Sequence, residues 1–410
     1  MTYDVVVVGG GPGGSICAAQ LARMGLSALV LEKTHFPRFH LGESLLPHSM
    51  KILRDVGVLE AVDARFLRKF GARFHDDLGG RKDRFEFRTG WHAEPPHAYQ
   101  VPRDTFDELL LRHAATCGAE VREGWTVKRI TRDPLGVVAV SPEGAEVPIA
   151  ARFVVDATGR DALTAHEART TEKIDGLDQT AIYAHYEGIP REPGELEGDI
   201  DIVLMRARVD ERPSWFWVIP FKDGRTSVGA VVSRRFIREH HKGDLSAVYE
   251  AAVASSATMQ RMLANAKMLW PKVEATADFS YRVRQMSGPG WLAVGDAGGF
   301  IDPLFSTGAH IAMNGGYRGA LAIADHLASG KPEPIAAWEA EMRLAAETFL
   351  TAVKAFYAGP LVDLLFLENK RVPMRRSITS LLAGDVFHDQ IWIRDARLRL
   401  ADMVANPTAW

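Results

Sequence analysis

The segment Gly9-Gly10-Gly11-Pro12-Gly13-Gly14 constrains the possible folds of this chain more than any other. An apolar run at residues 4–8 precedes it and reads as a strand, and a helical pattern follows it to about residue 24. Residues 28–32 read as a second strand. A strand, a glycine loop, a helix and a strand in this order predict a βαβ unit.

The glycines of the loop are spaced as G-x-G-x-x-G at Gly9, Gly11 and Gly14. Where side chains are missing, backbone amides at the positive N-terminus of the helix can approach a pyrophosphate. Glu32 ends the second strand about twenty residues further on, where a carboxylate can accept hydrogen bonds from the ribose hydroxyls of an adenosine. We therefore expect Gly9, Gly11, Gly13, Gly14 and Glu32 to bind a dinucleotide.

The pattern changes in the middle of the chain and then returns. Strand-like stretches without intervening helices between about residues 180 and 232 predict an antiparallel sheet. The expected elements after the first unit are a helix at 109–115, strands at 120–121, 153–156, 200–209, 215–219, 226–232 and 291–296, and a helix of small residues at 308–329. From Trp338 to Phe356 apolar residues recur at helical steps, which predicts a long amphipathic helix that ends at Gly359-Pro360, with shorter helices after it.

This order predicts an α/β protein with a Rossmann-type nucleotide domain that is interrupted and resumed. The expected parts are a discontinuous nucleotide domain at 1–68, 98–175 and 276–330, a substrate domain with an antiparallel sheet at 69–97 and 176–275, and a helical region at 331–410. A chain of 410 residues with 47% apolar composition can bury several such cores.

Composition and charge exclude several classes of function. The formal net charge of -3 and the absence of a Lys/Arg block argue against nucleic acid or an anionic membrane as a partner, and no apolar run is long enough to span a bilayer. The two cysteines, Cys17 and Cys117, and the immediate start of the first strand favour a reducing cytoplasm. The 14 histidines form no metal-ligand pattern, so we expect no metal.

Two later turns identify the dinucleotide. Residues 156–160, Asp-Ala-Thr-Gly-Arg, and residues 295–297, Gly-Asp-Ala, resemble segments of the FAD-dependent hydroxylases, halogenases and geranylgeranyl reductases. The resemblance implies FAD as the cofactor, with Asp296 at its ribityl-phosphate region. Further cofactor contacts are expected at Arg38, Arg103, Asp156 and Gly308. Arg103 could also be an ordinary residue at the N-terminus of a helix, and Arg38 a surface ion-pair residue.

Residues 214–220, Ser-Trp-Phe-Trp-Val-Ile-Pro, narrow this resemblance to one branch. Trp215, Trp217, Ile219 and Pro220 match the Trp-x-Trp-x-Ile-Pro motif of the flavin-dependent halogenases. The loop around Phe36-Pro37-Arg38 is similar to the strap that covers the flavin in these enzymes. Without the resemblance, alternating bulky residues could simply form the core face of a buried strand. With it, Trp215 and Trp217 are expected to form a wall between flavin and substrate.

The resemblance implies a reaction and a catalytic lysine. A flavin C4a-hydroperoxide, formed from FADH2 and oxygen, oxidises chloride or bromide to hypohalous acid, which reaches a lysine beside the substrate. Lys69, in a segment similar to the Lys-x-Gly-Ala of pyrrole and phenol halogenases, is the matching residue. It could instead be one more solvated cation near several arginines. An ammonium group can donate hydrogen bonds and, when desolvated, can lose its proton.

The halide and the substrate are assigned from one turn at residues 302–308. The amides of Thr307 and Gly308 are expected to hold the halide at the start of the small-residue helix. Phe305 stands where tryptophan halogenases have a glutamate, so an electron-rich phenol or pyrrole is the better fit for the adjoining pocket. The polar residues 75–77 depart from many phenol halogenases.

The sequence therefore predicts an FADH2-dependent halogenase that is supplied by a separate flavin reductase. Its substrate is an aromatic small molecule, free or tethered to a carrier protein, because residues 381–386 are similar to halogenases of carrier-bound pyrroles. Two alternatives remain open. One is an FAD-dependent monooxygenase or dehydrogenase of the same fold, and the other is a flavin-binding accessory protein without turnover.

Overall fold

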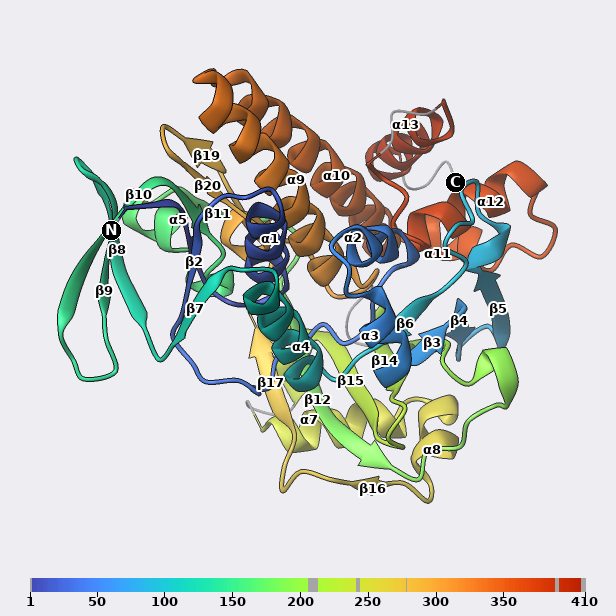
Figure 1. Ribbon diagram of the computed structural model, residues 1–410. Helices are drawn as coiled ribbons and strands as arrows, with labels where there is room; N and C mark the ends of the chain where they lie inside the picture. The colour runs from blue at the N-terminus through green and yellow to red at the C-terminus, as the bar shows by residue number, and fades with distance from the viewer. Residues whose placement is uncertain (1, 206–212, 241–243, 278, 388–390, 407–410) are drawn as a thin grey trace.

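The structure is a computed structural model that describes residues 2–205, 213–240, 244–277, 279–387 and 391–406. A largely parallel sheet forms the N-terminal part, at the left of Figure 1. Its strands, in spatial order, are β19 (Ser287–Gly288), β20 (Trp291–Ala293), β10 (Glu146–Asp156), β1 (Thr2–Val8), β2 (Ala28–Glu32) and β7 (Glu120–Glu123). A β-ribbon of β8 (Thr126–Arg132) and β9 (Leu135–Val140) extends it through β10.

The parallel sheet is built from strands that are apolar on both faces. Val5, Val6 and Val7 of β1 are fully buried, as expected for a strand covered on both faces. Val5 and Val7 face the helices, whereas Val6 faces the β8–β9 ribbon. On one side α1 (Pro12–Arg23) packs against α9 (Thr307–Ser329), so closely that a Cβ on Gly316 would lie 2.1 Å from the Gly13 carbonyl oxygen. The expected βαβ unit and the return of the chain to this sheet at β20 are confirmed.

The second sheet is mainly antiparallel and occupies the lower part of Figure 1. Its strands, in spatial order, are β16 (Lys267–Met268), β12 (Gln179–Glu187), β15 (Thr226–Ser233), β14 (Ser214–Pro220), β13 (Ile200–Met205), β4 (Gly71–Asp76) and β5 (Arg81–Glu86), with β17 (Glu274–Ala277) also paired to β12. One pairing, β13 with β4, is parallel. The predicted strand at 200–209 is described only to Met205, and residues 206–209 lie outside the described part of the chain.

Strand β14 shows how this sheet separates two cores. Trp215, Trp217 and Ile219 point to the face shared with the C-terminal helices, whereas Phe216 and Val218 pack under α7 (Leu245–Ala254) and α8 (Ala257–Leu263). This is the two-residue alternation of a strand buried on both faces. The tryptophan pair therefore belongs to one face of the sheet only.

Helices occupy the C-terminal part of the chain. The expected amphipathic helix is α10 (Glu333–Ala358), which runs beside α9 in Figure 1 and buries Trp338, Met342 and Phe349 along one side. Gly359 and Pro360 end it, and α11 (Pro360–Leu365), α12 (Val372–Leu382) and α13 (Ile391–Ala405) follow. The α/β fold with a helical C-terminal region is thus confirmed, while the exact domain boundaries stay a prediction.

Smaller elements complete the frame of the site. Helix α4 begins at Arg103 and runs to Thr116, six residues earlier than its apolar pattern at 109–115 indicated. The short strands β3 (Leu67–Lys69) and β6 (Ala98–Gln100) pair with each other in a separate two-stranded sheet. No helix in the described ranges has the length and apolar character needed to cross a membrane.

Candidate active site

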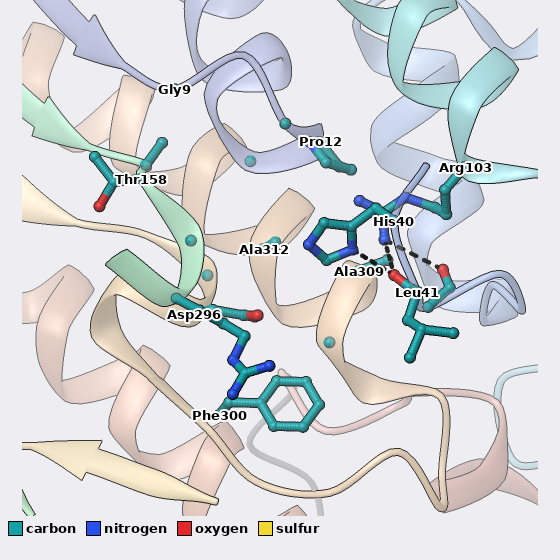
Figure 2. A pocket seen from close by; sticks show the side chains of 18 of the residues that line it. Gly9, Pro12, His40, Leu41, Arg103, Thr158, Asp296, Phe300, Ala309 and Ala312 are labelled. Atoms are coloured by element: carbon teal, nitrogen blue, oxygen red, sulfur yellow. Dashed lines mark hydrogen bonds between the residues drawn. The ribbon is translucent and has the colours of Figure 1, made fainter. Parts of the chain in front are cut away.

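A cavity of about 580 Å³ lies at the carboxyl ends of β1, β2 and β10, between the two main sheets. Gly9, Gly11 and Glu32 line one end, and Trp215 and Ile200 line the other. Figure 2 shows that Asp296 and His40 point into the same space from opposite sides. Carboxyl ends of parallel strands are the usual position of ligands in α/β sheets.

The glycine loop leaves room for a ligand next to its backbone. A Cβ on Gly9 would lie 2.2 Å from the Ala157 carbonyl oxygen, and one on Gly14 would lie 2.0 Å from the Gly9 carbonyl oxygen, so both positions require glycine for packing. Gly11 is different, because the nearest atom to its Cβ would be Arg38 Nη2 at 3.6 Å. A side chain on Gly11 would enter the cavity. The loop therefore fits a pyrophosphate that contacts the backbone directly.

Glu32 is held in place at the end of β2. Its Oε2 accepts a hydrogen bond from the Gly10 amide at 2.7 Å, and its Oε1 accepts from the amide and the hydroxyl of Thr34 at 2.9 and 2.7 Å. The side chain is buried but lines the cavity. This geometry suits a carboxylate that receives ribose hydroxyls.

The two aspartates expected at the cofactor have different surroundings. Asp296 lines the cavity, and burial raises its pKa to about 6 although the Arg103 charge acts in the opposite direction. Asp156 is fully buried behind the cavity wall. Its carboxylate accepts hydrogen bonds from the amides and hydroxyls of both Thr158 and Thr164, so it holds the turn that lines the cavity. Any effect of Asp156 on a cofactor would act through this turn.

The loop at residues 36–44, here called the strap, closes over the middle of the cavity. Arg103 donates to the Leu41 carbonyl oxygen at 2.5 Å, and both Arg38 and Arg103 form ion pairs with the fully buried Asp107. The Arg103 Nε to Asp107 Oδ1 distance is 2.6 Å. Asp107 was not predicted from the sequence, although its i, i+4 spacing from Arg103 on a helix could have indicated the pair. Asp107 thus orients both predicted flavin arginines.

The two tryptophans line the far end of the cavity and are anchored differently. Trp217 covers Gly229 so closely that a Cβ there would lie 2.1 Å from the indole ring, and its Nε1 donates to Ser227 Oγ at 3.1 Å. Trp215 Nε1 donates to the hydroxyl of Tyr357 at 3.0 Å. Phe305 does not line this cavity and packs edge-on against Phe356 in the core behind it.

Lys69 lies immediately behind the cavity wall. It is 1% exposed, and its Nζ donates to Ser44 Oγ at 2.9 Å and to the Leu45 carbonyl oxygen at 3.1 Å. The third side of the amine faces the ring of Phe87, 5.2 Å from the centroid. Because Ser44 itself lines the cavity, one hydroxyl group separates Lys69 from the space that reaches the glycine loop.

Burial lowers the pKa of Lys69 to about 7, and the negative charge of Asp199 acts against this effect. Asp199 was not predicted from the sequence, where only an inconspicuous Gly-Asp marks it. A Cβ on Gly198 would lie 1.9 Å from the Arg68 carbonyl oxygen, so this segment packs directly on β3. Asp199 accepts a hydrogen bond from Arg84 Nε at 2.6 Å. Both protonation states of Lys69 are therefore accessible near neutral pH.

We predict that Lys69→Met changes the stability of the folded protein in a pH-dependent way, because it removes a buried amine. The pKa of Lys69 is lower in the folded protein than its ordinary value of 10.5, so the unfolded chain binds more protons between pH 7 and 10.5. The folded state loses stability as pH falls through this window, by roughly 4 kcal/mol at its lower end. We expect Lys69→Met to have a higher Tm than the wild type at pH 6.5, with a smaller difference at pH 10. Equal differences at both pH values would contradict the assignment.

The turn before α9 forms part of the cavity wall. Pro303, Ser306, Thr307 and Gly308 line it, and Ser306 adopts a left-handed conformation with φ 56°. The turn is closed by a hydrogen bond from the Ser306 amide to the Pro303 carbonyl oxygen at 3.1 Å. The first amides of a long helix carry partial positive charge, so the Thr307 and Gly308 positions suit a small anion. Within the described chain no group of three or more His, Cys, Asp or Glu side chains could hold a metal.

Comparison with known proteins agrees with this geometry. A family model described as tryptophan halogenase matches residues 4–95 and 84–378. A tryptophan 2-halogenase of Chondromyces crocatus is 33% identical over 397 residues, which cover 95% of this chain and 72% of that relative. A 1H-pyrrole-2-carbonyl peptidyl-carrier-protein brominase of Pseudoalteromonas luteoviolacea is 33% identical over 329 residues, with 78% and 77% covered. The solved structure of the flavin-dependent brominase Bmp2 superposes with a TM-score of 0.89 at 27% identity and full coverage of both chains.

Proposed function

This chain belongs to the tryptophan halogenase family of flavin-dependent halogenases, and from that premise we propose that it chlorinates or brominates a pyrrole or phenol through Lys69. The observation that carries the proposal is the buried Lys69 amine, which is separated only by Ser44 from a cavity that begins at a dinucleotide-binding loop. A surface lysine would be hydrated and would have no such connection.

The cofactor of this family is FAD in its reduced form, which supplies, together with oxygen, the two-electron oxidant that converts a halide ion to hypohalous acid. Gly9, Gly11 and Gly14 would hold its pyrophosphate, and Glu32 would bind the adenosine ribose. Asp296 and Arg103 line the middle of the cavity, where hydroxyl and carbonyl oxygens of the cofactor would need a carboxylate and a guanidinium.

The tryptophan wall would keep the organic substrate away from the oxidant. Trp215 and Trp217 fill the far end of the cavity, and their indole nitrogens are tied to Tyr357 and Ser227. Fixed rings of this size would exclude an aromatic substrate from the flavin end of the cavity. Halogenation would thus be favoured over direct oxygenation of the ring.

Lys69 can act in two ways, and its pKa of about 7 leaves both open. As an ammonium group it would donate a hydrogen bond to hypohalous acid, which then gives its halogen to the ring and leaves as water with the ring proton. As an amine it would react with hypohalous acid to form a haloamine and water. The haloamine would then exchange its halogen for the ring proton and regenerate the amine.

The substrate is proposed to be electron-rich and tethered to a carrier protein. Phe305, which packs in the core behind the cavity, supplies no base for activating a less reactive ring. The brominase relative is named for a pyrrole on a peptidyl carrier protein, and the Bmp2 structure spans this entire chain. Free tryptophan is a competing substrate, because another relative is named a tryptophan 2-halogenase. A separate flavin reductase would supply reduced FAD.

The proposal is tested with purified protein, reduced FAD, oxygen and bromide, offered carrier-bound pyrrole-2-carboxylate, a free phenol and tryptophan. We expect the carrier-bound pyrrole or the phenol to gain the mass of bromine less one hydrogen. A product that gains only oxygen would instead establish a monooxygenase. Absence of any product, with FAD bound, would favour an accessory protein. NAD(P)H consumption without an added reductase would contradict the two-component arrangement.

A further inference from the structure

Asp302, at the start of the turn before α9, is a buried carboxylate that has no cationic partner among the described residues. It is 1% exposed. Its Oδ1 accepts from the Leu304 amide at 2.9 Å, and its Oδ2 accepts from the Tyr357 hydroxyl at 3.1 Å. Tyr357 is the titratable side chain that faces it from α10, and no Lys, Arg or His of the described residues forms an ion pair with it.

Other buried acids of this protein are compensated. Asp107 pairs with two arginines, Asp199 pairs with Arg84, and Asp201 pairs with Arg73. Asp156 pairs with no cation of the described residues but accepts four hydrogen bonds from the amides and hydroxyls of two threonines. A buried carboxylate that lacks a cation and accepts only two hydrogen bonds is costly when ionised. Accordingly, burial raises the pKa of Asp302 to about 7.

The position of Asp302 matters because the same turn carries the proposed halide site. Asp302 lies on one side of the tight turn closed by Ser306 and Pro303, and Thr307 and Gly308 lie on the other. At an effective dielectric constant of about 20, two like unit charges repel by about 4 kcal/mol at about 4 Å and by proportionally less at longer separations. A repulsion of about half that size corresponds to about 30-fold in binding. A halide and an ionised Asp302 are therefore unfavourable together.

We propose that this turn binds a halide together with a proton on Asp302, so that halide affinity falls as pH rises. The inference rests on the proposed function, because it assumes that Thr307 and Gly308 hold the halide. Converting a halide ion to hypohalous acid requires one proton for each halide, so a proton that enters with the halide is chemically useful. Tyr357, which also holds Trp215, becomes a positioning residue for this exchange.

Two substitutions separate the charge of Asp302 from its hydrogen bonds. Asp302→Asn imitates the neutral acid, so halide binding should be tight and independent of pH. Tyr357→Phe removes a donor that favours the ionised carboxylate, so protonation becomes easier and the pH dependence should move to higher pH. The two substitutions are thus expected to change the pH dependence of halide binding differently: one abolishes it and the other moves it to higher pH. A general loosening of the turn would not produce both results.

The measurement uses FAD-loaded protein titrated with bromide between pH 5.5 and 9. The change in flavin absorbance gives the Kd, and an indicator dye in weak buffer records proton uptake in parallel. We expect the wild-type Kd to weaken by up to about 30-fold across this range. Proton uptake should accompany bromide near neutral pH and be lost in Asp302→Asn. The control is Asp83→Asn. Asp83 lies on strand β5 and pairs with Lys370 and Arg375, so its substitution should leave the pH dependence of bromide binding as in the wild type.

The Asp302→Asn variant distinguishes titration of Asp302 from titration of other groups around the cavity. Asp296 has a pKa of about 6, His40 one of about 4 and Lys69 one of about 7. If Asp302→Asn keeps the wild-type pH dependence, one of these groups is responsible and the proposal is overturned. A pH-independent wild-type Kd would overturn it equally. Absence of bromide binding at every pH, with FAD still bound, would instead count against the halide site and hence the proposed function.

Discussion

Lys69→Ala is expected to reduce halogenation by at least about a thousandfold while FAD affinity changes less than threefold. Proton transfer and hydrogen bonding by one positioned group typically contribute 10²–10⁴-fold, and Lys69 is proposed to carry all of it here. FAD affinity should persist because Lys69 lies behind Ser44 and does not line the cavity. Product formation is measured by mass spectrometry, and FAD affinity by flavin fluorescence.

Two further variants distinguish a loss of catalysis from a loss of folded structure. Lys267→Ala removes an exposed lysine, with 77% of its side chain accessible, and should leave the rate unchanged. Lys69→Arg retains a cation that donates hydrogen bonds but does not deprotonate. Partial activity in Lys69→Arg would favour hydrogen bonding to hypohalous acid, and complete loss would favour the haloamine. Halogenation by Lys69→Ala within threefold of the wild type would remove Lys69 from its proposed role.

Gly11→Val is expected to weaken FAD binding by at least about a hundredfold without unfolding the protein. Gly11 has φ -67°, which valine can adopt, and no atom lies closer than 3.6 Å to the added Cβ. The valine side chain would therefore occupy the space in which the pyrophosphate must contact the loop. Loss of two such hydrogen bonds, each about 1.5 kcal/mol with a charged partner, accounts for a factor of this size.

Gly14→Ala is the contrasting variant. Its Cβ would lie 2.0 Å from the Gly9 carbonyl oxygen, so the loop and α1 must move apart. We expect a lower Tm of the FAD-free protein for Gly14→Ala and an almost unchanged Tm for Gly11→Val. If Gly11→Val bound FAD within threefold of the wild type, the loop would not be the pyrophosphate site.

Local patterns in the sequence predicted those parts of the fold that depend on neighbouring residues. The G-x-G-x-x-G loop between a strand and a helix indicated the βαβ unit, and the helical steps from Trp338 to Phe356 indicated α10. The start of α4 at Arg103 was given only as an alternative interpretation of that residue, because the first turn of the helix is polar and has no apolar period to read.

The contacts that tune the site could not be read in this way. Lys69 meets Ser44 across 25 positions, and Trp215 meets Tyr357 across 142. Asp199 reaches Lys69 only because Gly198 lets two backbone segments come together. Such pairs depend on the packing of whole sheets and helices. The same is true of Phe305, which the sequence placed at the pocket and the structure places in the core behind it.

The wall of the cavity has a composition that bears on the lifetime of the enzyme. Hypohalous acids oxidise thioethers and thiolates readily, yet among the described residues that line the cavity there is neither methionine nor cysteine, although the chain has 12 methionines. Cys17 lies on the buried side of α1, and burial raises its pKa to about 12, which keeps it a thiol and a poor nucleophile. An oxidant held in this cavity therefore meets no thioether or thiolate among the described lining residues, although Lys33 and His40 are part of the wall. Oxidation of sulfur side chains should be slow while the oxidant stays inside the cavity, and its escape into solvent becomes the main hazard to them.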